Sequence, residues 1–151
     1  MSKIFVQIAS YRDPELVPTI RDLIAKAKYP ENLTFGICWQ RDDTESLEEY
    51  TNDPRFGVVD VKYHESEGLG WARHITNTLY NDEEFTLQID SHTRFSEFWD
   101  EQLIDMIKQL QEKGYPKPLI TSYAPSFDPK NDPEGRINVP WKTDFDRFFP
   151  E

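Results

Sequence analysis

Polar and charged residues follow directly after several apolar, β-rich segments of the chain, and Asp90 is the most informative of them. It follows residues 85–89, and His92 lies two positions later. In an extended turn, residues i and i+2 point the same way, so one carboxylate and one imidazole could hold one cation. This pair of ligands suits Mn²⁺ better than Ca²⁺, which prefers oxygen ligands. The alternative is a turn aspartate followed by a solvated loop histidine.

The first β-rich segment ends in residues that could bind a nucleotide. Tyr11 and Arg12, beside Ser10, could stack on a base and neutralise a phosphate group. The alternative is that Arg12 pairs with Asp13 or Glu15, which are its neighbours in the sequence.

Two adjacent aspartates, Asp42 and Asp43, follow the second β-rich segment. A carboxylate at this position can accept hydrogen bonds from a base or a ribose, and the sequence leaves open which of the two would do so. Alternatively, these residues form a turn or cap a short helix that begins near Ser46.

A glycine-rich segment, Gly68 to Gly70, precedes a predicted helix that carries Arg73. Glycine allows a backbone to approach a ligand closely, and the N-terminus of a helix attracts phosphate. The spacing matches neither a dinucleotide-binding fingerprint nor a P-loop. The alternative is an ordinary start of a helix, with Arg73 as a surface charge.

The elements that must position these residues alternate between strand and helix patterns. β-rich runs predict strands at residues 3–9, 33–39, 58–63, 85–89 and 119–123. Helical periodicity predicts helices at residues 15–28, 68–81 and 98–113, with a short one around 46–50 and with Asp13 as the cap of the first. This alternation predicts an α/β fold with a mostly parallel sheet flanked by helices. Ligands bind beyond the carboxyl ends of the strands in such sheets.

Composition excludes several classes of protein. The chain has 151 residues, which suits one domain, and a net charge of -11, which disfavours nucleic-acid binding. Its single cysteine, Cys38, excludes a disulfide framework and is expected in the core. No apolar run approaches the roughly 20 residues of a membrane span. Without an export signal, the cytoplasm is the expected location.

Four segments together resemble GT-A-type glycosyltransferases. The resemblance is closest to the cytoplasmic-type N-acetylglucosaminyltransferases that glycosylate hydroxyproline, and more distant to the polypeptide N-acetylgalactosaminyltransferases. It is carried by residues 4–13, 67–73, 87–92 and 121–125. The Asp-Ser-His sequence at 90–92 replaces the commoner Asp-x-Asp metal motif. The resemblance implies a GT-A, Rossmann-like nucleotide-diphospho-sugar transferase fold in residues 1–127, with residues 128–151 as an irregular tail that could begin an acceptor region.

The resemblance also implies an activity: transfer of a sugar, N-acetylglucosamine by family likeness, from a UDP-sugar to a hydroxyl group of an unknown protein or glycan, with retention of configuration. Asp90 and His92 would bind Mn²⁺ (or Mg²⁺), which stabilises the charge that grows on the leaving diphosphate. The residues implied to contact the donor are Ser10, Tyr11, Arg12, Asp42 or Asp43, Gly70, Arg73 and Ser91. No catalytic residue is implied, and no histidine follows His92 to serve as a further metal ligand. The alternatives are a non-catalytic nucleotide-sugar-binding module and an acidic interaction domain without a small ligand.

Overall fold

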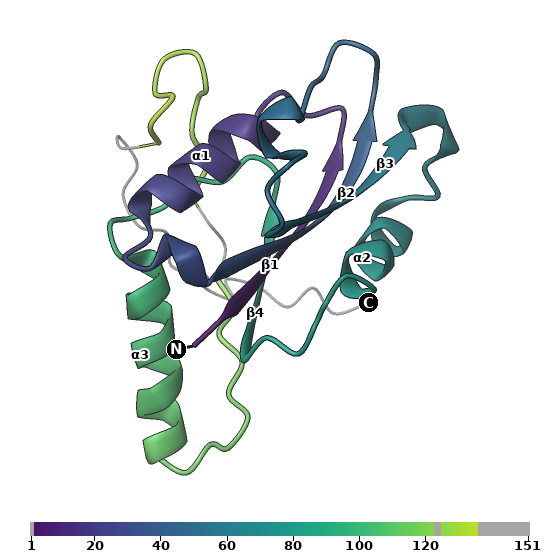
Figure 1. The fold of residues 1–151 in the computed structure, drawn as a ribbon. Coiled ribbons are helices and arrows are strands. Elements are labelled where there is room, and N and C mark those ends of the chain that lie inside the picture. Colours follow the sequence, from purple (N-terminus) through teal and green to yellow (C-terminus); the bar gives the residue numbers. More distant parts are fainter. Residues whose placement is uncertain (1, 123–124, 136–151) are drawn as a thin grey trace, which may run out of the picture. The chain divides into compact units, whose positions relative to one another are not determined.

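The computed structural model describes residues 2–122 and 125–135, and the first of its two compact units ends at Glu101. This unit contains a four-stranded sheet in the order β3-β2-β1-β4, in which every neighbouring pair is parallel (Figure 1). The strands are β1 (Ile4–Tyr11), β2 (Leu33–Arg41), β3 (Phe56–Lys62) and β4 (Phe85–Asp90). The predicted α/β class with a parallel sheet flanked by helices is therefore confirmed.

Two helices connect strands of this sheet: α1 (Leu16–Lys26) lies between β1 and β2, and α2 (Leu69–Asn77) lies between β3 and β4. A third helix, α3 (Trp99–Glu112), follows β4, and 3₁₀ turns occur at Pro30–Asn32, Glu48–Tyr50 and Tyr63–Glu65. α1 and α2 lie on opposite faces of the sheet (Figure 1). On the α2 face, Gln7 of β1 donates a hydrogen bond to the Asn77 side chain at 2.8 Å. The first four predicted strands and the three longer predicted helices are all present, with ends that differ by a few residues.

The core on the α1 face combines apolar side chains of the two central strands with one stripe of α1. The stripe has the i, i+4, i+7 spacing of a single helix face. On the sheet, the Phe35 ring stacks on Phe56 with centroids 4.2 Å apart. The residues of this core that are at least 95% buried include Ile4, Val6, Ile8, Phe35 and Ile37 from the sheet and Leu16, Ile20 and Leu23 from α1. Burial of this apolar area is what holds α1 against the strands.

Cys38 lies in β2 with its side chain fully buried, as predicted for a core cysteine. Burial raises the pKa of its thiol, which makes the residue a poor nucleophile. Among the described residues, no helix is both long enough and apolar enough to cross a membrane.

The predicted fifth strand is wrong over residues 119–122, which form no regular structure, and Tyr123 lies outside the described residues. Leu119 is 88% exposed. A β-prone sequence becomes a strand only where another strand pairs with it and a surface buries its side chains. These residues belong to the second compact unit, whose described part contains no strand. The division between a donor-binding core and a tail at residue 127 is a functional prediction that the packing does not test.

The close contact between β1 and β2 on the α2 face can be tested with glycine substitutions. A Cβ atom on Gly36 would lie 2.4 Å from Cζ of Phe5 and 3.2 Å from the carbonyl oxygen of Thr76. We expect Gly36→Ala to lower the free energy of unfolding by roughly 1–3 kcal/mol in urea titrations, because the core is overpacked. Gly57→Ala is the matched control, since its nearest contacts are ordinary ones at 3.5 Å. Equal losses in the two variants would contradict this account.

Candidate functional site

The loop after β4 is fastened to a polar stripe on α1. The Thr19 hydroxyl lies at the centre of this contact and is fully buried. It donates to the carbonyl of Ser91 at 2.7 Å and accepts from the amide of Thr93 at 3.0 Å. Just before the helix, Glu15 accepts from the Arg94 guanidinium at 2.5 Å. Together these bonds fix the loop that carries the Asp-Ser-His motif.

The same stripe continues toward the C-terminal end of α1. Asp22 accepts from the amide of Phe95 at 2.6 Å, and the carbonyl of Leu23 accepts from the Trp99 indole at 2.9 Å. Beyond the helix, the buried carboxylate of Asp100 accepts from two backbone amides, those of Lys28 at 2.7 Å and Tyr29 at 2.9 Å. The loop and the first residues of α3 are thus attached along the whole length of α1.

Asp13 joins this loop to the turn between β1 and α1. One carboxylate oxygen accepts from the amide of Glu15 at 2.9 Å. The other accepts from the Ser91 hydroxyl at 2.6 Å and contacts Nδ1 of His92 at 2.7 Å. Burial alone would raise the pKa of Asp13, but these hydrogen bonds outweigh it and lower the pKa. The predicted helix cap is wrong, because α1 begins at Leu16 and Glu15 occupies the cap position.

Asp90, the last residue of β4, and His92, two positions later, both remain accessible. Their side chains are 64% and 60% exposed, and Asp90 Oδ1 lies 3.7 Å from Nη2 of Arg73. Because Asp13 engages Nδ1 of His92, Nε2 is the ring nitrogen left for a ligand. One carboxylate and one imidazole nitrogen fit two positions in the shell of Mn²⁺ or Mg²⁺. Among the described residues, no group of three or more His, Cys, Asp or Glu side chains could hold a metal ion. Substrate oxygens and water would have to complete the shell.

Arg12 organises the ends of β1, β2 and the turn after β3. Its backbone is in the left-handed region, with φ of 48°, and its amide donates to the carbonyl of Gln40 at 2.9 Å. The guanidinium lies 4.6 Å from the centre of the Tyr63 ring, and its Nε donates to Asp42 at 3.4 Å. Tyr11 packs edge-on against Tyr63, with centroids 6.5 Å apart, and is 53% exposed. An exposed aromatic surface thus lies beside a guanidinium and a carboxylate.

Arg12 does not pair with its sequence neighbours Asp13 and Glu15. Arg12 binds Asp42, whereas Glu15 binds Arg94 and Asp13 binds His92. The alternative that Arg12 pairs with Asp13 or Glu15 is therefore wrong.

The two neighbouring aspartates have different environments. Asp42 accepts from the hydroxyl of Thr44 at 2.5 Å and from its amide at 2.9 Å, and these bonds, with Arg12, lower its pKa. Asp43 has an 86% exposed side chain and forms an ion pair with Lys62, which lowers its pKa. Of the two carboxylates, Asp42 is the one that contacts Arg12, which packs on Tyr63.

Three other residues are expected at the donor from the sequence: Ser10, Ser91 and Gly70. The first two are buried, and Gly70 has open space beside it. Ser10 is fully buried, and its hydroxyl has no hydrogen-bond partner among the described residues. Ser91 is 4% exposed, because its hydroxyl faces Asp13. Gly70 lies in the first turn of α2 with open space around it, whereas Gly68 has a φ of 97° that favours glycine. Their roles at the donor remain predictions.

Tyr63 belongs to this candidate site but is not among the residues that the sequence pattern singles out. The pattern predicts it only as the last residue of a strand, whereas it directly follows Lys62, the last residue of β3. Its position beyond a strand end was the signal, because Tyr11 ends β1 in the same way and the carboxyl ends of parallel strands share one edge of the sheet.

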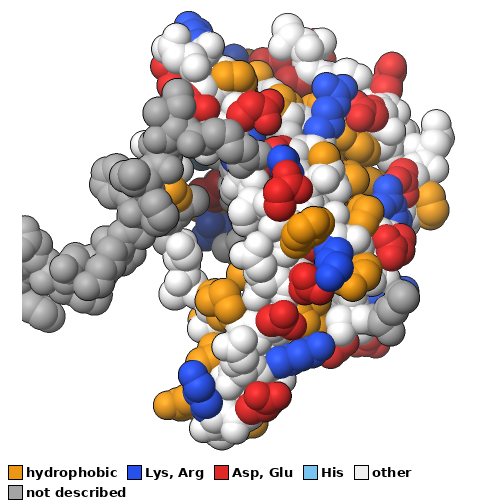
Figure 2. Space-filling view, turned by 90° about the vertical axis from the view of Figure 1, so that its left-hand side faces the viewer, with side chains coloured by type: hydrophobic (Ala, Val, Ile, Leu, Met, Phe, Trp, Pro, Cys, Tyr) orange, Lys and Arg blue, Asp and Glu red, His pale blue; other side chains and the backbone are white. Residues whose placement is uncertain are grey.

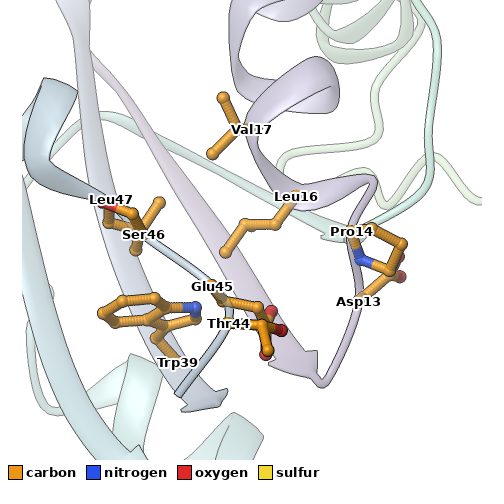
Figure 3. A pocket seen from close by; sticks show the side chains of 9 residues that line it. All are labelled: Asp13, Pro14, Leu16, Val17, Trp39, Thr44, Glu45, Ser46 and Leu47. Atoms are coloured by element: carbon orange, nitrogen blue, oxygen red, sulfur yellow. The ribbon is translucent and has the colours of Figure 1, made fainter. Parts of the chain in front are cut away.

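A cavity of about 240 Å³ lies on the α1 face, behind Asp13. Figure 3 shows Trp39 of β2 below Leu16 and Val17 of α1, with residues 44–47 closing one side. Its volume is below the roughly 300–1,000 Å³ of common small-molecule pockets. On the face drawn in Figure 2, acidic and basic side chains of the described residues are interspersed, without a continuous basic patch.

Comparison with known proteins gives one family and one fold. The sequence model of the family "GlcNAc: Glycosyltransferase (GlcNAc)" matches residues 3–52 and 48–139. Two solved structures of S. aureus TarS 1-349 are similar at 20% identity, one with a TM-score of 0.56 and one, in complex with UDP-GlcNAc, with 0.55. The match covers 73% of this chain but only 32% and 31% of those chains. This likeness shows the fold. No curated protein sequence matches significantly.

The attachment of the loop to α1 can be tested at Thr19. Thr19→Val keeps the shape of the side chain but leaves the carbonyl of Ser91 and the amide of Thr93 without their buried partner. We expect a loss of roughly 1–3 kcal/mol in the free energy of unfolding and faster hydrogen exchange at the Thr93 amide. Thr86→Val, on an exposed strand position, is the control and should change neither quantity. Unchanged exchange in Thr19→Val would show that the hydroxyl does not hold the loop.

Proposed function

The chain belongs to the Glycosyltransferase (GlcNAc) family, and from this we propose that it binds a UDP-sugar at the carboxyl ends of its parallel strands and transfers the sugar to a hydroxyl group. UDP-N-acetylglucosamine is the donor we favour. The TarS structure with UDP-GlcNAc supports this choice, because it shares the fold of this chain. The acceptor hydroxyl, on a protein or a glycan, and retention of configuration are part of the proposal through family resemblance alone. So is the division into a donor-binding core at residues 1–127 and a tail.

The arrangement around Arg12 is the observation that carries this proposal. An open aromatic face suits a nucleobase, and base–aromatic stacking contributes roughly 1–3 kcal/mol in nucleic-acid complexes. Tyr11 and Tyr63 provide exposed rings that are nearly perpendicular to each other, with Arg12 over one face of Tyr63, and Asp42 offers an acceptor for base or ribose groups. Arg12 lies between them, where it can neutralise a phosphate. We assign the nucleoside to these exposed residues, since the cavity behind Asp13 is small.

The diphosphate belongs, in this proposal, at the end of β4. Asp90 and His92 would hold a divalent cation there, and such an ion stabilises the negative charge that develops on a departing diphosphate. Arg73 forms only a loose, exposed pair with Asp90, at 3.7 Å. Exposed pairs of this kind contribute little to stability, so Arg73 can turn to a phosphate oxygen when a ligand is bound.

We expect the chain to bind UDP-GlcNAc in calorimetric titrations only when Mn²⁺ or Mg²⁺ is present. Asp90→Asn should weaken that binding by about 10-fold or more, because it removes one of the ligands of the cation. Asp60→Asn is the matched control. It removes an exposed carboxylate that pairs with Arg41 on β2 and should leave binding unchanged.

Three results would count against parts of this proposal. Equal binding with and without a divalent cation would exclude a role for the metal in donor binding. Unchanged affinity in Asp90→Asn would exclude Asp90 as a ligand of the cation. Donor binding by the wild type without any release of UDP on prolonged incubation would favour the non-catalytic binding module.

The aromatic surface gives a separate test. Tyr63→Ala should weaken binding of UDP by roughly 10-fold, as expected for loss of a stacking face, and should leave the dependence on Mn²⁺ unchanged. Tyr29→Ala removes a tyrosine of similar exposure just before the start of β2, at the opposite end of the strands, and we expect it to have no effect. Equal affinity of the wild type and Tyr63→Ala would place the base elsewhere.

A further inference from the structure

We propose that Asp13 is a positioning residue for His92: its carboxylate keeps the ring proton on Nδ1, so that the lone pair of Nε2 is available to a divalent cation. The role of the cation rests on the proposed function, whereas the orientation of the ring rests on contacts within this chain. Neither the sequence pattern nor the family resemblance assigned this role to Asp13.

The first support is the direction of the hydrogen bond. Oδ2 of Asp13 lies 2.7 Å from Nδ1 of His92. An ionised carboxylate only accepts hydrogen bonds, so Nδ1 must carry the proton. In a neutral imidazole the other nitrogen is then unprotonated, and this is the form that binds a metal.

The second support is that Asp13 is itself held in place. Its side chain is only 15% exposed, whereas that of His92 is 60% exposed. The amide of Glu15 and the hydroxyl of Ser91 bond to its two oxygens at 2.9 and 2.6 Å. The carboxylate therefore cannot turn away from the imidazole without losing two other bonds.

The third support is chemical. Histidines that bind metals commonly donate their second ring N–H to a carboxylate, which fixes the ring and raises the basicity of the ligand. The pair of Asp13 and His92 has this arrangement, with the free nitrogen on the exposed side chain at the end of β4.

Asp13→Asn tests the proposal, because it replaces one acceptor oxygen with a donor NH₂ group while keeping the shape of the side chain. If the amide oxygen of Asn takes the bond from Glu15, its NH₂ group faces Nδ1 of His92. The ring would then have to accept at Nδ1, and its proton would move to Nε2.

The readout is the ¹⁵N spectrum of the imidazole groups in the metal-free full chain at about pH 8. His92→Gln identifies the His92 signals among the three histidines. We expect the Nδ1–H form in the wild type and the Nε2–H form in Asp13→Asn. A second measurement is Mn²⁺ affinity in the presence of UDP, which should fall roughly 10- to 100-fold in Asp13→Asn.

Asp22→Asn is the matched control, since that carboxylate holds the same loop through the amide of Phe95. It should leave the His92 spectrum and the Mn²⁺ affinity unchanged. A wild type in the Nε2–H form, or a spectrum that is the same in Asp13→Asn, overturns the proposal. So does a change of tautomer with undiminished Mn²⁺ affinity. A wild type that takes up no Mn²⁺ overturns the proposed donor site, and the spectra then decide separately whether Asp13 sets the proton on His92.

Discussion

The interface between α1 and the loop after β4 is the constraint on which the candidate site depends. The polar stripe of α1 runs directly beside its apolar stripe, with the same helical spacing, so one helix both packs on the sheet and binds the loop. Thr19 satisfies two backbone groups of the loop at the buried centre of this contact. Each buried group left without a partner would cost roughly 1–3 kcal/mol. The residues at the end of β4 therefore take their positions from α1 as much as from their own strand.

The acidic character of the chain has a local explanation at the strand ends. Carboxylates there are paired with cations from neighbouring elements: Asp42 with Arg12, Asp43 with Lys62, and Asp90 with Arg73. These pairs are exposed and screened by water, so they contribute little to folding. They keep the side chains at the edge of the sheet, where a phosphate can compete for an arginine. A net charge of -11 is thus compatible with binding a diphosphate, provided that a cation accompanies the ligand.

Much of the sheet could be predicted from the sequence, because buried parallel strands are short apolar runs and the connecting helices show clear periodicity. The fifth strand could not, since residues 119–122 have the composition of a strand but no partner in the described part of their unit. Ser10 shows the same limit at the level of a side chain. It lies at the end of β1, as expected, but the alternation of the strand turns its hydroxyl into the interior. Tyr63 is a further example, since its pattern is that of a strand residue, whereas β3 ends at Lys62 and leaves Tyr63 at the edge of the sheet.

By itself, the sequence determined the order of strands and helices, the parallel class of the sheet and the residues that follow each strand. These properties depend on local composition and on the rule that parallel strands present their carboxyl ends at one edge. Only the tertiary structure decided which of those residues meet. Asp13, which local sequence suggested as a helix cap, lies 79 positions from His92 and yet binds it. Such pairs form because buried polar groups of α1 and of the loop after β4 bond to each other. The periodicity of the sequence does not predict which of these groups meet.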